Sequence, residues 1–335
     1  MHGNGIIKKL FFTTFSVQLI SMLSGTINSI VDGMVIGKCL GMREMTAYGY
    51  VSPVIMIILA LGVLVSAGTS GACGRIIGKG DKKEIINCFS SIFLTGVVLG
   101  VLGLLFLEIC AGTIAGFLTG SAGGEADIYT KLVQKFLTGY GYNILPSLLI
   151  VHLTPIMQFD GNPRLSVAAL TVMTVSNVSL DILNGLVFHQ GMFGMAMATS
   201  LSSILALCIM LSNFFRKNHL MRLSPKGFQW QYVKMLFEYG TSASIMIFAN
   251  TMTLFFLNRL LGRHVSKDAV AALAAVNSAS VLCTSIGMAL RITLVTLVSM
   301  FEGEQEQLRL LECHITPLAE ILTLAIEDVR PYKCT

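Results

Sequence analysis

The sequence contains little charge. Only 12% of its 335 residues are Asp, Glu, Lys or Arg, while 54% are hydrophobic. Soluble domains carry about 25% charged residues, and the mean hydropathy of this chain is +0.74. These values exclude an ordinary soluble domain and indicate an integral membrane protein. The net charge of +5 falls mainly in Lys and Arg of the loops, so we predict no nucleic-acid partner.

The sequence also lacks the patterns of an enzyme or of a disulfide scaffold. Its eight cysteines have irregular spacings, which favour neither a disulfide framework nor a zinc site. The stretch 71–80 resembles a phosphate loop but has Cys73 and Gly80 at two required positions. The stretch 68–72 lacks the final glycine of a nucleophile elbow. We therefore predict no enzymatic activity and no cofactor apart from a coupling ion.

Long uncharged runs are what the sequence does contain. A helix needs about 20 apolar residues to cross the bilayer core. Such runs predict membrane-spanning helices at 10–37, 45–74, 85–124, 136–159, two between Arg164 and Arg216 that break at 188–194, about 235–258, and 269–301. After Glu302 no uncharged run exceeds seven residues, so we expect 302–335 to be a charged tail. The predicted fold class is an all-α, polytopic integral membrane protein.

A basic, polar connection at 216–234 divides the chain. The part before it, 1–215, is predicted to form an amino-terminal lobe of six transmembrane helices. The part after it, 235–301, is predicted to form two helices of an incomplete second lobe. A six-helix unit followed by another in the same orientation is typical of transporters built from parallel repeats. We therefore expect one complete six-helix lobe plus the first two helices of a second lobe.

The distribution of Lys and Arg among the loops predicts the orientation. With the N-terminus inside, twelve of these residues fall in cytoplasmic loops and seven on the opposite side. Because Lys and Arg are enriched in cytoplasmic loops, this bias predicts a cytoplasmic N-terminus. We expect a multi-pass protein of the cell membrane.

Two aspartates lie inside the apolar runs. Asp32 is the only charged residue within 10–37, and Asp181 lies in the fifth predicted helix at a similar distance from the same membrane face. A charge at that depth costs about 2.5 to 3.5 kcal/mol on insertion scales. Asn28 and Asn177 each precede one aspartate by four residues, which places an amide on the same helical face. Carboxylates with amide oxygens suit a proton or a hard cation such as sodium. Alternatively, each aspartate hydrogen-bonds a neighbouring helix.

Two other charged residues, together with Asn28, are candidates for lining a cavity. Glu108 lies in the outer part of the third predicted helix, where solvation is the alternative interpretation. Arg291 lies deeper, in the eighth predicted helix, and either partners a carboxylate or lines a cavity.

Several motifs together resemble the multidrug and toxic compound extrusion (MATE) family. They are VDGMVIGKCLG in the first span, GKGDKKE at 78–84, QFDGNPR at 158–164, NVSLD at 177–181 and MFGMAMATSLSS at 192–203. The resemblance covers about residues 5–305 and rests on the order and spacing of the motifs. It implies a two-lobed, twelve-helix secondary antiporter that exports organic cations or drugs in exchange for protons or sodium.

The resemblance also implies a set of site residues. The cation site of the family's amino-terminal lobe falls on Asp32, Asn177, Asp181 and Thr199, and the residue types match. The sequence departs from the family pattern in three respects: the first helix has no proline, Ile182 replaces a frequent proline, and four helices of the second lobe are absent.

The functional prediction is therefore a secondary active antiporter for cationic or amphipathic small molecules, embedded in membrane lipid, with a proton or sodium as coupling ion. One alternative is a lipid-linked saccharide flippase, whose cavity should contain several Arg or Lys residues, whereas Arg291 is the only deep cation. Another alternative is a truncated membrane fragment that does not transport.

Overall fold

The computed structural model describes residues 3–120, 125–215, 227–264, 284–294 and 296–298, and these residues form helices and short turns without any strand. The helices are α1 (Gly3–Val35), α2 (Met42–Lys79), α3 (Lys82–Thr119), α4 (Glu125–Phe159), α5 (Pro163–Leu183), α6 (Gly191–Leu211) and α7 (Trp230–His264). A further helical segment lies within Thr284–Val298. The predicted all-α fold is confirmed.

The helices α1 to α6 are each long and apolar enough to cross a membrane. They match the six spans predicted for the first lobe, and the chain is a multi-pass membrane protein. Helix α7 has 35 residues but is not among these six, and it begins inside the predicted linker, at Trp230. Residues 216–226 of the linker, residues 265–283 and the predicted tail at 302–335 lie outside the described residues.

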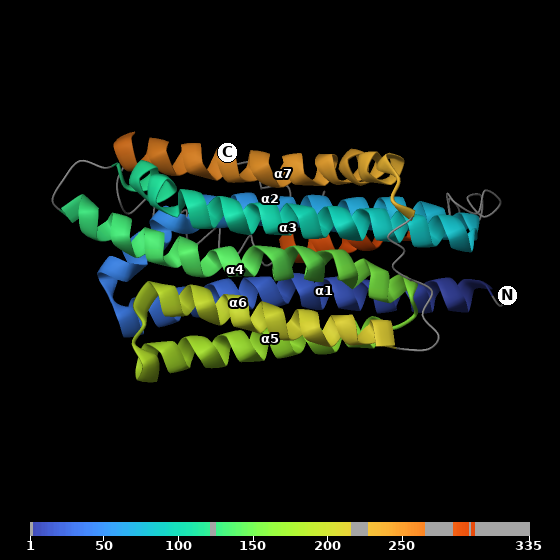
Figure 1. Cartoon of the computed structure of the whole chain (residues 1–335), viewed down its shortest axis with the longest axis horizontal. Helices are drawn as coiled ribbons and strands as arrows, with labels where there is room; N and C mark the ends of the chain where they lie inside the picture. Colours follow the sequence, from blue (N-terminus) through green and yellow to red (C-terminus); the bar gives the residue numbers. More distant parts are fainter. Residues whose placement is uncertain (1–2, 121–124, 216–226, 265–283, 295, 299–335) are drawn as a thin grey trace, which may run out of the picture.

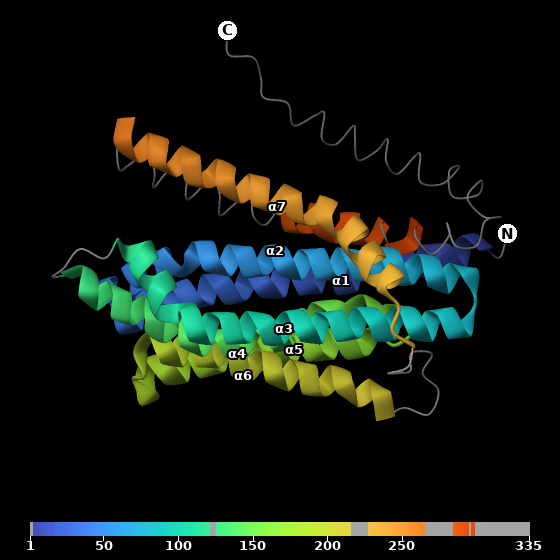
Figure 2. The same ribbon diagram turned by 45° about the horizontal axis from the view of Figure 1, so that its top comes forward.

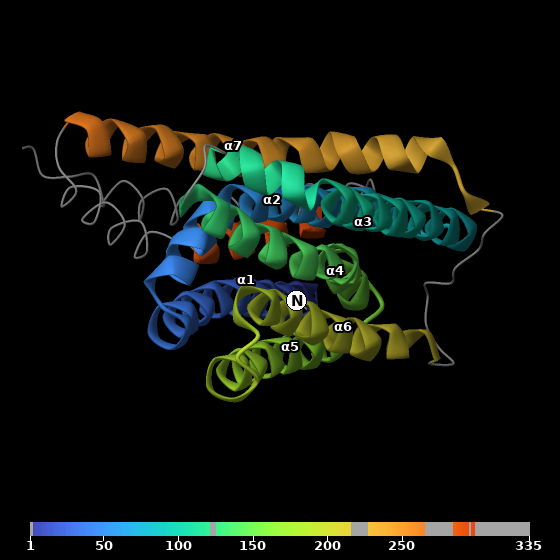
Figure 3. The same cartoon turned by 60° about the vertical axis from the view of Figure 1, so that its left-hand side comes forward.

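The helices run alongside one another, and successive helices alternate in direction (Figure 1). The connections α1–α2, α3–α4 and α5–α6 lie at one end of the bundle, which we call the α1–α2 end. The connections α2–α3 and α4–α5 lie at the other, the N-terminal end. Figure 3 shows α4 in the middle of the bundle, with α2, α3 and α7 on one side and α5 and α6 on the other.

Local sequence explains where α2 ends and α3 begins. Gly80 follows α2 with a φ of 77°, a left-handed conformation that favours glycine. The next residue, Asp81, caps α3, since its carboxylate accepts hydrogen bonds from the backbone N–H of Lys83 at 2.8 Å and of Glu84 at 3.4 Å. The GKGDKKE motif is therefore a tight turn between two helices.

Two glycines allow α2 and α7 to pack backbone against backbone. A Cβ on Gly68 of α2 would overlap the carbonyl oxygen of Leu236 in α7, and a Cβ on Gly240 of α7 would overlap that of Leu64 in α2. We call Gly68 and Gly240 the glycine contact. In Figure 2, α7 lies close to α2 near its own start and diverges from it toward the α1–α2 end. The glycine contact therefore fixes α7 to the first lobe through its first half.

Candidate cation site

The ends of α1 and α5 lie together at the α1–α2 end of the bundle. Each helix finishes in a five-residue π-helical turn, at Ile36–Leu40 and at Asn184–Phe188, and the two turns contact each other. A Cβ on Gly185 would lie 2.8 Å from the Cβ of Cys39, so glycine permits this close approach. Because π-helical turns often occur at functional sites, this end of α1 and α5 is a candidate functional region.

Asn184 holds the turn that joins α5 to α6. Its amide nitrogen donates a hydrogen bond to the carbonyl oxygen of Gly191 at 3.0 Å, and its amide oxygen accepts one from the N–H of Gln190 at 3.1 Å. Gly194 leaves room for this side chain, since a Cβ there would overlap the Asn184 amide. Asp181 lies one helical turn before Asn184, so this network fixes the part of α5 that carries the carboxylate.

Asp32 of α1 and Asp181 of α5 face each other. Their carboxyl groups are close enough to interact electrostatically. Asp181 has an exposed fraction of 0%, and Asp32 is partly buried. Two ionised carboxylates are both acceptors and cannot bond to each other. A shared proton or a bound cation is therefore needed to hold this pair together in a low-dielectric interior.

The oxygens around this pair lack donors. Within the described part of the chain, no hydrogen-bond partner reaches Asp32 Oδ1, either carboxylate oxygen of Asp181, Asn28 Oδ1 or Asn177 Oδ1, all of which are buried. The Asn177 nitrogen donates to Thr199 Oγ1 at 3.4 Å, and the Thr199 hydroxyl donates to the carbonyl oxygen of Met195 at 3.3 Å. The Asn177 nitrogen and the Thr199 hydroxyl thus donate to other groups and not to the carboxylates. The buried oxygens of the site are left as acceptors without a donor. Leaving buried acceptors unpaired is costly, which favours a cationic occupant.

Two tyrosines that the sequence did not single out lie near the carboxylates. Tyr48 of α2 is within electrostatic range of both Asp32 and Asp181, and Tyr140 of α4 is within range of Asp32. Phe136 packs between them, edge-on to Tyr48 at 5.7 Å and stacked on Tyr140 at 5.5 Å between ring centroids. A tyrosine in an apolar helix gives no signal of such a neighbour, because its distance from the carboxylates is set only by the tertiary structure.

Two other predicted residues, Glu108 and Arg291, contact other parts of the structure. Glu108 of α3 directs its buried Oε1 toward Gly141 of α4, where a Cβ would lie 3.4 Å away. Arg291 lines a pocket between α2, α7 and the segment within Thr284–Val298. We therefore define the candidate cation site by the other five predicted residues: Asn28, Asp32, Asn177, Asp181 and Thr199.

The composition of the site limits its chemistry. Carboxylate and amide oxygens are hard ligands that suit a proton or a cation such as sodium, whereas transition metals favour imidazole or thiolate. In the described ranges, no group of three or more His, Cys, Asp or Glu residues is close enough to hold a metal ion. The arrangement can exchange a proton for a hard cation between two carboxylates.

Solved structures of transporters share the fold of this chain. A crystal structure of a MATE transporter in complex with MaD3S matches this chain with a TM-score of 0.84 and 21% identity, covering 95% of this chain and 72% of that one. A MOP superfamily transporter from Pyrococcus furiosus, reported to have a binding pocket of reverse polarity, matches with a TM-score of 0.81 and 21% identity, covering 95% and 70%. The fold is therefore that of the MATE transporters.

Sequence comparison finds similarity to one family. The model of the MatE family matches residues 18–183. A curated relative, the probable multidrug resistance protein YoeA of Bacillus subtilis (strain 168), is 22% identical over 87% of this chain. The chain spans 64% of the length of that relative. With the fold, these matches show that the chain is similar to the MatE family over residues 18–183.

Proposed function

We propose that the chain functions in secondary active transport and that the candidate cation site binds the coupling ion, a proton or sodium. The observation that carries this proposal is the facing pair Asp32 and Asp181, of which Asp32 Oδ1 and both Asp181 oxygens are buried without a donor in the described structure. A charged pair inside a membrane protein is costly to retain without a functional reason. Asn28 and Asn177 add oxygens that a hard cation needs to replace its water.

Coupling in this proposal follows from conformational preference. An ion that neutralises the carboxylates stabilises the arrangement in which α1 and α5 lie together. Without the ion, repulsion between Asp32 and Asp181 favours an arrangement in which these helices part. A ligand shifts such an equilibrium only by the difference in its affinity for the two states. The same difference links ion binding to substrate binding, so entry of the ion weakens binding of the exported molecule.

The proposed substrates are cationic or amphipathic small molecules, and the proposed exchange is antiport. Support comes from the similarity to the MatE family and from a relative named as a probable multidrug resistance protein. We further propose that the protein lies in the cell membrane with its N-terminus in the cytoplasm, since this orientation assigns twelve Lys and Arg residues of the sequence to the cytoplasmic side and seven to the other. Similarity to the MatE family over residues 18–183 also supports a non-enzymatic role.

The test compares an acid in the site with an acid outside it. The chain is produced in an efflux-deficient cell, and export of a fluorescent organic cation is measured for the native protein, Asp32→Asn and Asp127→Asn at matched membrane abundance. Asp127 is a suitable control because its side chain is 62% exposed and pairs with Lys131 at 2.8 Å. We expect export to be lost in Asp32→Asn and retained in Asp127→Asn.

The coupling ion is identified in proteoliposomes. A sodium gradient and a pH gradient are imposed separately, and the gradient that drives uptake by the native chain names the ion. Normal export by Asp32→Asn would refute the coupling role of the pair. Absence of export from the native chain would refute transport by this chain, and sodium binding measured by calorimetry would then test the ion site alone.

A further inference from the structure

A second polar site lies in the pocket between α2, α7 and the segment within Thr284–Val298. The pocket has a volume of about 170 Å³. Most of its lining is apolar and comes from all three elements: Val63, Ala67, Ala243, Met288 and Ile292. The polar contributions come from Arg291 and Ser242, with Glu238 and Tyr239 completing the lining.

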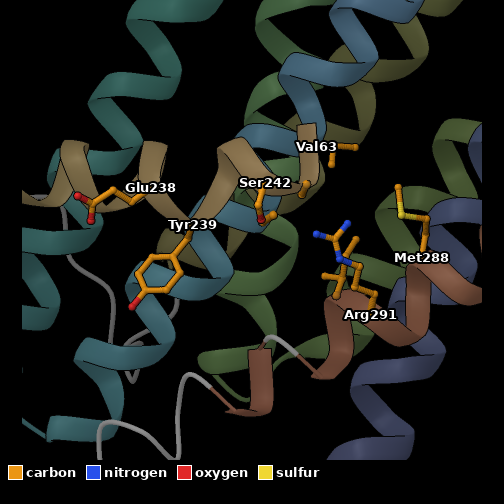
Figure 4. Close-up of a pocket in the computed structure, with 9 residues that line it drawn as sticks. Val63, Glu238, Tyr239, Ser242, Met288 and Arg291 are labelled. Carbon is orange, nitrogen blue, oxygen red and sulfur yellow. The ribbon is translucent and has the colours of Figure 1, made fainter. Parts of the chain in front are cut away.

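The two charged side chains of the pocket, Arg291 and Glu238, lie at different places in it. Figure 4 shows the Arg291 guanidinium extending from its helix toward Ser242 and Val63, whereas Glu238 lies at the opposite end of the pocket. Arg291 is partly buried. The Glu238 carboxylate is 60% exposed and pairs with Lys234 of its own helix at 3.7 Å. The interior of the pocket therefore contains a cation, and the acid lies at its exposed end.

No acidic side chain in the described residues forms an ion pair with Arg291. The facing acids Asp32 and Asp181 belong to α1 and α5 and interact with each other. An arginine remains charged in proteins, so Arg291 cannot lose its proton to become neutral in the absence of an acidic partner. A guanidinium among mostly apolar side chains of packed apolar helices is costly unless a ligand neutralises it.

The surrounding contacts hold the pocket in shape. The glycine contact, Gly68 with Gly240, brings α2 and α7 together next to Ala67 and Ala243, which also pack against each other. On the other side, Ser285 lies 3.3 Å from the hydroxyl of Thr26 in α1, which fixes the start of the segment that carries Arg291. The guanidinium is therefore presented by packed helices.

We propose that this pocket binds the acidic headgroup, a carboxylate or a phosphate, of an amphipathic molecule. The planar guanidinium matches either group through two parallel hydrogen bonds, and Ser242 offers a further donor. Pockets that hold a whole drug-sized molecule measure about 300 to 1,000 Å³, so 170 Å³ accommodates a headgroup and the first carbons of a chain. The apolar wall contacts those carbons, and the rest of the molecule extends toward the lipid.

This site is independent of the proposed ion coupling. Its residues belong to α2, α7 and the segment within Thr284–Val298, and the cation site belongs to α1, α5 and α6. The ligand of the pocket is an anion, whereas the proposed exported molecule is cationic or amphipathic. Binding to the pocket is measured without transport, so its failure and the failure of the proposed function are distinguishable.

The test measures binding of charged amphiphiles to the purified full chain in neutral detergent. The probes are dodecyl phosphate and dodecyltrimethylammonium, which share a chain length and differ in the sign of the headgroup. Isothermal titration is performed on the native chain, Arg291→Gln, Arg291→Lys and Arg164→Gln. Arg164 is an exposed residue at the start of α5 and controls for a loss of positive charge outside the pocket.

We expect the native chain to bind dodecyl phosphate at least about tenfold more tightly than dodecyltrimethylammonium. A factor of about ten in the dissociation constant corresponds to the free energy of one charge-assisted hydrogen bond. Arg291→Gln should lose that preference, Arg291→Lys should keep part of it, and Arg164→Gln should match the native chain. Equal affinity of the native chain for the two probes would overturn the proposal, even if Arg291→Gln failed to fold. Equal binding of dodecyl phosphate by the native chain and a folded Arg291→Gln variant would also overturn it.

A competition with inorganic phosphate identifies the source of the ligand. Displacement of dodecyl phosphate by inorganic phosphate would show that the headgroup alone is recognised and would assign the site to a soluble anion. Failure of inorganic phosphate to displace the amphiphile would assign the site to a lipid-like molecule. Displacement would therefore overturn the amphipathic part of the proposal and keep recognition of the acidic group, whereas failure of displacement would support the proposal as stated.

Discussion

The packing of α2 against α7 provides a stability prediction that depends on one methyl group. Gly68→Ala adds a Cβ that overlaps the carbonyl oxygen of Leu236 and lies 2.9 Å from the Cγ and 3.0 Å from the carbonyl carbon of that residue. Two of these three atoms belong to the backbone, so a change of rotamer cannot relieve the contact. We expect Gly68→Ala to push α7 away from α2.

The expected cost follows from the size of this displacement. Ordinary contacts of a Cβ begin at 3.4 Å. The helices must therefore part by about 1 Å, which removes about half of the van der Waals attraction at each contact along the interface. Overpacking of this kind costs about 1 to 3 kcal/mol. Replacing glycine in a helix also contributes about 1 kcal/mol of favourable helix propensity, which has to be subtracted.

Gly49→Ala in the same helix isolates the cost of the overlap. Gly49 is exposed, and no atom lies within 4 Å of its added Cβ, so this variant reports the propensity alone. Equilibrium unfolding of both variants is followed by circular dichroism in mixed micelles of a neutral detergent and sodium dodecyl sulfate. We expect the free energy of unfolding of Gly68→Ala to be lower than that of Gly49→Ala by about 1 to 3 kcal/mol.

The reasoning would be refuted by equal stability of the two variants. It would also be refuted if Gly240→Ala, which makes the reciprocal overlap with Leu64, were as stable as Gly49→Ala. A combined Gly68→Ala and Gly240→Ala variant should cost less than the sum of the two, because the first displacement of α7 already makes room for the second methyl group.

Two further predictions concern turns at opposite ends of the bundle. Asp81→Ala should lower the free energy of unfolding by about 1 kcal/mol, because it removes the cap of α3, and Asp81→Asn should restore most of the loss. Thermal unfolding distinguishes these variants, and equal stability of the alanine and native chains would contradict the capping role. Asn184→Ala should cost about 1 to 3 kcal/mol through the two hydrogen bonds at the α5–α6 turn, and it should also weaken sodium binding measured by calorimetry, because the turn fixes Asp181. Unchanged unfolding and binding would show that the turn is held in other ways.

Much of the architecture follows from the one-dimensional sequence. The uncharged runs predicted the six helices of the first lobe, because crossing a bilayer imposes a length and a composition on each segment separately. The helix ends were less predictable. Helix α1 begins at Gly3, before the charged residues that bounded the predicted run at 10–37, since hydropathy marks the part of a helix that crosses the membrane and the helix itself continues beyond it.

Part of the candidate cation site was also evident from sequence. Asp32 and Asp181 stand out because the cost of placing a charge in hydrocarbon is a property of the single residue. The spacing of four residues placed Asn28 and Asn177 on the same helical faces. No such local rule exists for Tyr48 or Tyr140, whose approach to the carboxylates depends on how α2 and α4 pack.

The sequence by itself determined that this chain is an all-α membrane protein, where its first-lobe helices cross and which residues within them are costly to bury. Only the tertiary structure decided which helices are neighbours, since apolar helices in lipid present no hydropathy pattern that distinguishes one partner from another. The facing of Asp32 and Asp181 depends on that packing. So do the glycine contact and the pocket around Arg291, because each joins residues more than a hundred positions apart in the chain.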